Sequence, residues 1–286
     1  MKRLAAIALT LAIGTAAFAQ TGRGMERCEL MLMGGAMNYI GDLNNQSVFS
    51  MPYAAGGVGV KVNLDNRWSV RAQVDYGHVG CDKDRIELRN LSFKSHVIEV
   101  AVMGEFSFRQ FGKLGVDYPW TPYIYGGIGV FHFSPEASYV DDYGALQWVD
   151  LQPLGTEGQG TVDFPERRPY RLMQLCLPFG VGAKWRVNKT FTLAAEYGLR
   201  KTWTDYLDDV STTYAGSEVL EADSQNGTLA ARMADRSGEV REGYVNARGI
   251  KRGDDSLDDW YAYFHLSVGI RLDVLLGWTQ KKRCKL

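Results

Sequence analysis

The segment Trp260–Leu272 alternates, residue by residue, between apolar side chains and polar or small ones. Successive side chains of a β-strand point to opposite faces, so the alternation predicts a strand with one apolar and one polar face. Strands of soluble proteins usually run to about 5–6 residues, whereas a strand that crosses a membrane needs about 9–11. Length and pattern together favour a strand of an outer-membrane barrel.

The N-terminus predicts export. A short basic start precedes an apolar run over residues 4–14, and Ala17-Phe18-Ala19 forms a small-x-small cleavage site. This is the pattern of a secretory signal peptide over residues 1–19. The residue after the predicted cleavage site is Gln20 and not cysteine, which argues against a lipoprotein. No other run approaches the about 20 apolar residues of a spanning helix.

The composition agrees with a barrel. Hydrophobic residues make up 45% of the chain, and 15 Tyr, 12 Phe and 7 Trp supply many aromatic side chains for an apolar wall. The formal net charge is −1, which gives no electrostatic reason to expect nucleic acid as a partner.

Eight segments have strand-like patterns: residues 28–40, 53–64, 67–77, 91–108, 122–133, 171–187, 190–201 and 260–272. Asp65-Asn66 and Asn188-Lys189 form tight turns, and long connections alternate with shorter ones. Outer-membrane barrels have an even number of antiparallel strands, short periplasmic turns and longer extracellular loops. We therefore predict an all-β fold, an eight-stranded antiparallel up-and-down transmembrane β-barrel with long extracellular loops and short periplasmic turns.

This fold divides the chain into a signal peptide (1–19), a periplasmic N-terminal segment (20–27), the outer-membrane β-barrel (28–272) and a basic periplasmic C-terminal tail (273–286). The competing fold is a soluble barrel of the lipocalin type, which would turn its apolar side chains inward and leave Arg71, Glu99 and Lys184 in water. Aromatic residues near strand ends, such as Trp68 and Trp185, suit the interfacial belts of a membrane barrel and favour that fold.

The polar faces of the predicted strands carry many charges: Lys61, Arg71, Asp75, Glu99, Glu105, Lys184, Arg186, Glu196, Arg200 and Arg271. Side chains fill the interior of an eight-stranded barrel, and buried charges require partners. We therefore predict a salt-bridged plug in the lumen and no conducting pore. The function should then lie in the loops, at the periplasmic face or on the outer wall.

An enzymatic site would need a nucleophile, a base and an orienting group close together. His265 is the best candidate base, because Ser267 shares its face and Glu99, Glu105 or Glu196 could orient it. Polar packing in a filled lumen explains these residues as well. We predict no enzyme, no cofactor and no metal site.

Several motifs follow one another along the chain, at residues 38–44, 90–95, 121–123, 127–135, 151–160, 178–182 and 202–211. The most specific is Thr202-Trp203-Thr204-Asp205-Tyr206-Leu207-Asp208-Asp209-Val210-Ser211. Together they resemble the PorG-like family, outer-membrane β-barrels of the type IX secretion system. The resemblance implies a non-enzymatic component of that machinery in the outer membrane of a Gram-negative bacterium. Its implied partners are the lipid bilayer, a periplasmic ring lipoprotein and associated secretion-system subunits.

Two other classes of function stay open on the residues themselves. One is a free-standing structural, porin-like or adhesive barrel, and the other, less favoured, is a lipid-modifying outer-membrane enzyme. Co-purification with periplasmic partners separates the first from a secretion component, and a lipid modification lost on deletion would support the second.

The motif loop holds Asp205, Tyr206, Asp208 and Asp209. Its three carboxylates could coordinate a hard cation, but their spacing is not that of a calcium loop. We expect an exposed, solvated loop. The segment Thr156–Gly160 likewise lacks the frame of a phosphate cradle and is predicted to be a loop turn.

Four cysteines in an exported chain suggest disulfides. Cys28 and Cys284 would both be periplasmic, and the first and last strands adjoin in a closed barrel, so we predict a Cys28–Cys284 bridge. The basic tail would suit an acidic partner surface. The candidate partner contacts are Lys281, Lys282, Arg283 and Lys285.

Overall fold

The computed structural model describes residues 27–44, 51–82, 89–111, 118–223 and 227–275. Within these ranges the chain forms nine strands: β1 (Cys28–Ile40), β2 (Tyr53–Asn63), β3 (Trp68–Cys81), β4 (Phe93–Ser107), β5 (Trp120–Val140), β6 (Leu146–Asp150), β7 (Met173–Arg186), β8 (Phe191–Thr202) and β9 (Trp260–Arg271). The short helices in the same ranges are η2 (Gln152–Leu154), α2 (Ser217–Asp223), α3 (Gly227–Ala234), η3 (Ser237–Glu239) and α4 (Leu272–Leu275).

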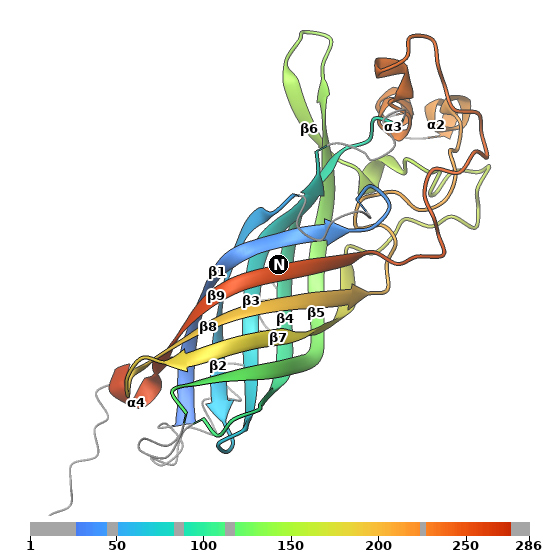
Figure 1. The fold of residues 1–286 in the computed structure, drawn as a ribbon. Helices are drawn as coiled ribbons and strands as arrows, with labels where there is room; N and C mark the ends of the chain where they lie inside the picture. Colours follow the sequence, from blue (N-terminus) through green and yellow to red (C-terminus); the bar gives the residue numbers. More distant parts are fainter. Residues whose placement is uncertain (1–26, 45–50, 83–88, 112–117, 224–226, 276–286) are drawn as a thin grey trace, which may run out of the picture.

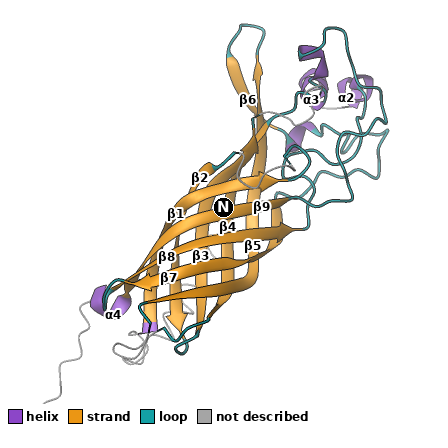
Figure 2. Cartoon of the chain, viewed as in Figure 1, coloured by secondary structure: helices purple, strands orange, loops and turns teal. Residues whose placement is uncertain are grey.

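Eight of the nine strands close into a barrel (Figures 1 and 2). Each strand pairs antiparallel with its neighbour in the order β4-β3-β2-β1-β9-β8-β7-β5, and a β4–β5 ladder completes the ring. The first and last strands pair over twelve positions, from Glu29↔Arg271 to Ile40↔Trp260. The predicted eight-stranded antiparallel up-and-down barrel is confirmed.

The two ends of the barrel differ. The turn end carries α4 and the tight turns, in which Asp65 Oδ1 accepts the amides of Arg67 (2.7 Å) and Trp68 (2.8 Å), and Asn188 Oδ1 accepts that of Phe191 (2.9 Å). These side-chain acceptors satisfy amides that a two-residue connection leaves without a ladder partner. At the opposite end, the cap end, residues 141–172, 203–223 and 227–259 form a thick outer layer, which we call the cap (Figure 2).

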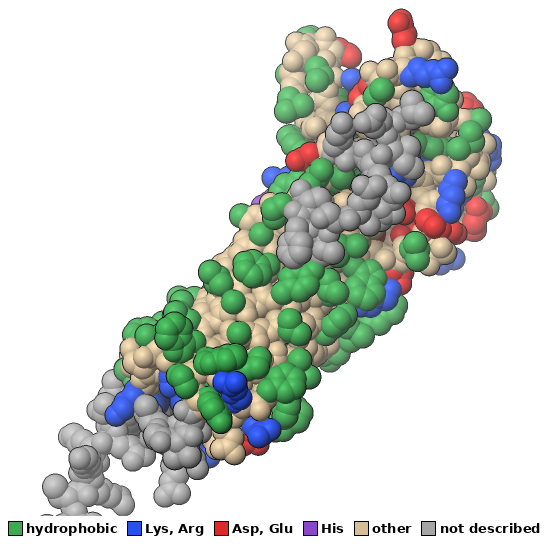
Figure 3. All heavy atoms as spheres, viewed as in Figure 1, with side chains coloured by type: hydrophobic (Ala, Val, Ile, Leu, Met, Phe, Trp, Pro, Cys, Tyr) green, Lys and Arg blue, Asp and Glu red, His purple; other side chains and the backbone are tan. Residues whose placement is uncertain are grey.

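The wall has an apolar outer face and a polar inner face. On β8, Phe191 and Leu193 are exposed, whereas Thr192, Glu196 and Arg200 are buried inside. On the side seen in Figure 3, hydrophobic side chains cover the barrel, and charged groups gather toward the two ends. This orientation is the reverse of a lipocalin-type barrel. Helices contribute little to the wall, and no helix among the described residues is long and apolar enough to cross a membrane.

The cap is larger than the strand patterns indicate. Strand β5 continues to Val140, well beyond the predicted end at residue 133, and forms a protruding hairpin with β6 through the pairs Glu136↔Asp150 to Val140↔Leu146 (Figure 1). The connection after β8 contains α2, α3 and η3. A hydrophobic core fills the cap end of the lumen and continues into the cap, where it includes Leu154, Leu207 and Val210. Residues 1–26 and 276–286, which hold the predicted signal peptide and basic tail, lie outside the described residues.

Candidate functional site

A buried ion-pair network occupies the turn half of the lumen. Arg71, on β3, is fully buried and donates from both terminal nitrogens to the Glu196 carboxylate, at 2.5 and 2.6 Å. Its Nη1 also lies 3.1 Å from Glu105, which pairs on its other oxygen with Lys184 at 3.1 Å. Four strands thus contribute to one alternating chain of charges, in which each buried ion has an opposite partner.

Two further pairs extend the network along the lumen. Lys61 lies 3.1 Å from Glu29, and Arg200 donates to Glu99 at 3.1 Å. Asp75, also buried, accepts a hydrogen bond from Gln73 at 2.5 Å. The partner Glu29 is not among the residues predicted for the lumen, although it falls on the inward face of the first strand.

Tyrosine hydroxyls complete the network, and the sequence reasoning missed them. Tyr123 donates to Glu196 at 2.5 Å, and Tyr261 donates to Glu99 at 2.7 Å. Tyr261 alternates with apolar residues and so lies on the polar face of its strand, but residues 122–133 are apolar and Gly-rich on both faces, so alternation could not assign the facing of Tyr123.

The two remaining predicted lumen residues lie at the turn end. The Arg186 guanidinium lies 4.4 Å from the centroid of the Phe111 ring. This ring is buried, and the Lys184 ammonium lies 5.4 Å from its centroid. Arg271 is half-buried and pairs with Asp273 of α4 at 2.5 Å. It therefore belongs to the rim of the turn end and not to the lumen network, because β9 ends at this residue and the chain turns into the helix.

The candidate base His265 is part of this packing. It is fully buried, with Nε2 3.5 Å from Glu196, whose carboxylate already accepts hydrogen bonds from Arg71 and Tyr123. Ser267 is buried as well. Both side chains are too buried for a lipid substrate to reach them, so the geometry does not support catalysis at this pair. Within the described part of the chain, no three His, Cys, Asp or Glu side chains form a group that could hold a metal ion.

Aromatic rings close the cap end of the lumen. Phe131 and Phe133 point inward from β5 and are fully buried. Phe133 stacks on Tyr170 at 6.1 Å between centroids, and Tyr170 stacks in turn on Tyr206 at 4.7 Å. These stacked rings join a barrel strand to two separate segments of the cap, so the cap packs directly against the barrel.

The motif loop 202–211 is buried except for the exposed Trp203 and the half-buried Tyr206, contrary to the expectation of a solvated loop. Asp208 and Asp209 are 1% and 0% exposed, and Asp205 is 9% exposed. Leu207 and Val210, between and beside them, insert into the hydrophobic core. The expectation failed because the partners of these carboxylates come from segments far away in the sequence.

Glu157 is the main partner of the motif loop. Its fully buried carboxylate accepts the amides of Ser211 and Thr212, both at 2.9 Å, and the Thr212 hydroxyl at 2.6 Å. Arg252 donates to the same carboxylate at 3.0 Å and to the Asp209 carbonyl at 2.5 Å. Residues 152–160, 205–212 and 252 are thereby tied together, and nothing in the sequence alone pointed to Arg252.

A second cluster fastens the motif loop to the barrel itself. The Tyr39 hydroxyl, at the cap end of β1, lies 2.5 Å from Asp208 Oδ2 and 2.9 Å from Asp259 Oδ1. Burial raises the pKa of Asp208 to about 8 and that of nearby Asp205 to about 9. Asp209 is shifted less, to a pKa of about 6, because the Arg252 charge and hydrogen bonds from Thr156 and Tyr170 offset its burial.

The other predicted site residues lie at or beyond the limits of the described chain. Lys281, Lys282, Arg283, Lys285 and Cys284 are outside the described residues. Cys28 is buried at the start of β1. The Cys28–Cys284 bridge and the basic contact surface therefore stay predictions.

A family model described as "Domain of unknown function (DUF6089)" matches residues 7–147, just under half of the chain. No curated protein matches the sequence. The chain is similar to the solved structure of Ail, the attachment invasion locus protein of Yersinia pestis, at 9% identity and a TM-score of 0.38, over 85% of this chain and 96% of that one. Neisserial surface protein A gives 11% identity and a TM-score of 0.38 over 85% and 96%. OprG of Pseudomonas aeruginosa gives 11% and 0.36 over 87% and 98%.

Proposed function

We propose that this chain is an outer-membrane barrel of a Gram-negative bacterium that serves as a non-enzymatic component of the type IX secretion machinery and contacts a periplasmic ring lipoprotein. We also propose that the barrel conducts no ions. The observation that supports this is the filling of its lumen. Ion pairs fill its turn half, and an aromatic core fills its cap half. A barrel filled in this way acts through its surfaces.

The outer wall supports the membrane location. The eight barrel strands are 11 to 21 residues long, which is enough for the about 9–11 residues of a tilted transmembrane strand. At the turn end, Trp68, Trp120 and Trp185 are 51%, 45% and 58% exposed, as in an aromatic girdle at a membrane interface. By the rule of short periplasmic turns and long outer loops, the turn end faces the periplasm and the cap faces outward.

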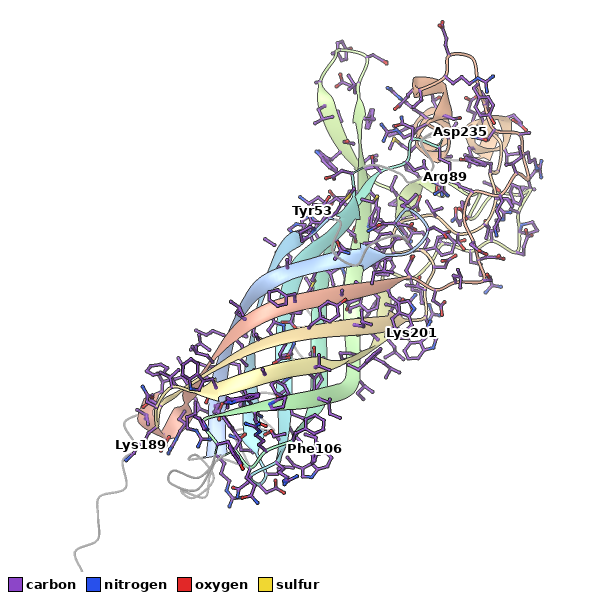
Figure 4. All side chains as sticks on the ribbon, in the orientation of Figure 1. Tyr53, Arg89, Phe106, Lys189, Lys201 and Asp235 are labelled. Atoms are coloured by element: carbon purple, nitrogen blue, oxygen red, sulfur yellow. The ribbon has the colours of Figure 1, made fainter. Side chains whose placement is uncertain are left out.

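The turn end is suited to an acidic partner. Arg27, Arg67 and Lys189 are exposed there, and Lys189 is labelled beside α4 in Figure 4. The predicted basic tail would follow directly on α4 and add to the same surface. A basic rim on the periplasmic side attracts acidic protein surfaces by long-range electrostatics. The identification of the partner as a secretion ring rests on the family resemblance.

The test is a mild-detergent pull-down from outer membranes with a tag placed between the predicted cleavage site and Cys28. The full chain is compared with a variant in which Lys281, Lys282, Arg283 and Lys285 are changed to Glu. Recovery of a periplasmic ring lipoprotein with the full chain, and its loss with the charge-reversed tail, is the expected result. Equal recovery with both chains would contradict the tail contact, and a barrel that emerges alone even after cross-linking would contradict the secretion role.

One observation favours a second candidate, a free-standing adhesive barrel. The β5–β6 hairpin stands clear of the barrel, and its Tyr143, Leu146 and Trp148 are 96%, 63% and 53% exposed (Figure 1). Exposed apolar side chains on a projecting element are typical of a binding surface. Changing these three residues to Ser should abolish surface binding if the chain is an adhesin, and should leave the pull-down of periplasmic partners unchanged.

A further inference from the structure

The Tyr39 hydroxyl faces two carboxyl groups at hydrogen-bonding distance but carries one proton. It lies 2.5 Å from Asp208 Oδ2 and 2.9 Å from Asp259 Oδ1. A hydroxyl can donate to only one of two acceptors, and its lone pairs repel an ionised carboxylate at the other. Both contacts are favourable only when one of the two carboxyl groups is protonated and donates to the tyrosine oxygen.

The remaining carboxyl oxygens are held in place by backbone amides. Asp208 Oδ1 accepts the amide of Val210, and Asp259 Oδ2 accepts that of Leu207, both at 2.9 Å. All three side chains are at most 1% exposed. Neither carboxyl group can turn away from the tyrosine without leaving an amide unsatisfied in the interior.

Arg252 is a buried cation that acts on Asp208 and lowers its pKa, but its donors are shared with other acceptors, and the remaining neighbours are negative. Asp42 acts on Asp208, and Asp205 acts on Asp259, both as further negative groups. The nearest buried cation, Arg252, is engaged by Glu157 at 3.0 Å and by the Asp209 carbonyl at 2.5 Å. An excess of buried carboxylates therefore meets at this point.

The other charged neighbours act on Asp42. Arg89, labelled near the base of the cap in Figure 4, donates to the carbonyl oxygens of Arg252 at 2.5 Å and Asp42 at 3.2 Å. Lys251 is exposed and pairs with Asp254 at 2.9 Å. Burying a carboxylate without a cation is costly, so protonation is the means left to neutralise the pair.

We propose that one proton, shared by Asp208 and Asp259 through the hydroxyl of Tyr39, fastens the cap to the barrel, and that loss of this proton at alkaline pH releases the cap. We call the three side chains the latch. Tyr39 belongs to β1, Asp208 to the motif loop, and Asp259 directly precedes β9, so the latch joins both ends of the 203–259 connection to the first strand.

The direction in which cap stability changes with pH follows from the pKa shifts of Asp208 and Asp259. Burial is the largest cause that raises the pKa of both Asp208 and Asp259 above the ordinary 3.8, and the charge of Asp208 raises that of Asp259 further. A carboxyl group whose pKa is raised by folding stabilises the folded form fully below the unfolded value, and this contribution is lost as the pH rises through the folded value. The cap should therefore loosen steadily as the pH rises from the ordinary carboxyl pKa toward the raised one, and be held least firmly at alkaline pH.

The experiment measures amide hydrogen exchange in residues 204–212 of the full-length protein in detergent micelles. Rates are divided by the intrinsic rate at each pH between about 6 and about 10. The expected result is protection that falls by about tenfold per pH unit for the one proton released on opening, until the pH passes the raised pKa of the closed latch, and that stays constant above it. The barrel strands should keep their protection over the whole range.

Two substitutions imitate the protonated state. In Asp208→Asn or Asp259→Asn, the amide NH₂ donates to Tyr39 and the amide oxygen accepts the backbone amide, so either variant should keep its protection up to about pH 10. Tyr39→Phe removes the bridge and should lower protection at every pH. Asp163→Asn, which alters an exposed pair with Arg248 on the same cap, is the matched control and should behave as the unchanged chain.

Two results would overturn the latch. The first is a loss of protection with rising pH that persists unchanged in both Asn variants. The second is protection of the unchanged chain that ignores pH but falls with a calcium chelator and returns with added Ca²⁺, since a cation would then neutralise the cluster in place of the proton.

Discussion

Replacing Glu157 by Ala tests whether one buried carboxylate organises the cap. Its oxygens accept the amides of Ser211 and Thr212, the Thr212 hydroxyl and a guanidinium nitrogen of Arg252, at 2.6–3.0 Å. The substitution removes these acceptors together. It leaves two buried amides without partners and takes from Arg252 its closest counter-ion.

The size of the effect follows from these losses. Removing one partner of a buried ion pair costs about 3–5 kcal/mol, and the unsatisfied amides push the value toward the upper end. At about 1.4 kcal/mol per factor of ten, even the lower figure raises the population of the open cap by more than about 100-fold. The barrel ladders are not touched, so the effect should stay local.

Hydrogen exchange at Ser211 and Thr212 is the assay, because their amides are the groups that lose an acceptor. Protection should fall at least about 100-fold in Glu157→Ala and less in Glu157→Gln, which keeps the acceptor oxygen but not the charge. Glu166→Ala is the control, since Glu166 lies on the same segment and is exposed. Unchanged protection in Glu157→Ala, or an equal effect of the control, would refute the role given to Glu157.

Three further predictions concern other contacts. Arg71→Met strands the Glu196 carboxylate in the lumen and should lower the free energy of unfolding of the barrel by about 3–5 kcal/mol, seen as a lower temperature for the heat-induced gel shift; no change in that temperature would contradict the network. Gly41→Ala places a methyl group where Asp259 and the Tyr39 hydroxyl already lie, so exchange of the motif-loop amides should rise by at least about tenfold, for an overpacking cost of about 1–3 kcal/mol; an unaffected loop would show that the cap joins the barrel differently. Peptide mapping without reduction should recover a linked Cys28–Cys284 pair, and recovery of both cysteines as alkylated free thiols would contradict the predicted bridge.

The barrel itself could be predicted from the sequence because the patterns that specify it involve residues close together in the chain. Alternation along each strand fixes which side chains face inward, and this placed Arg71, Glu99 and Glu196 on the inner face. The tight turns at Asp65 and Asn188 fixed the pairing of neighbouring strands. Such signals involve residues a few positions apart, and the fold depends on little else.

The cap could not be predicted, because its contacts join distant segments. Glu157 and Arg252 are 95 positions apart, and Tyr39 and Asp259 are 220 apart. No periodicity marks such partners, and a run of carboxylates in a loop is usually solvated. Arg271 was misplaced for a related reason: alternation assigns a face but does not tell where the strand ends and α4 begins.

The central claim is that the lumen is filled and that the protein acts through its surfaces. The most direct measurement is the ionic conductance of the full-length protein inserted in a planar bilayer, at neutral and at alkaline pH. The account predicts no stepwise conductance, with or without the cap released at alkaline pH, because the ion pairs of the turn half close the lumen on their own. Stable open-channel steps at neutral pH would contradict it.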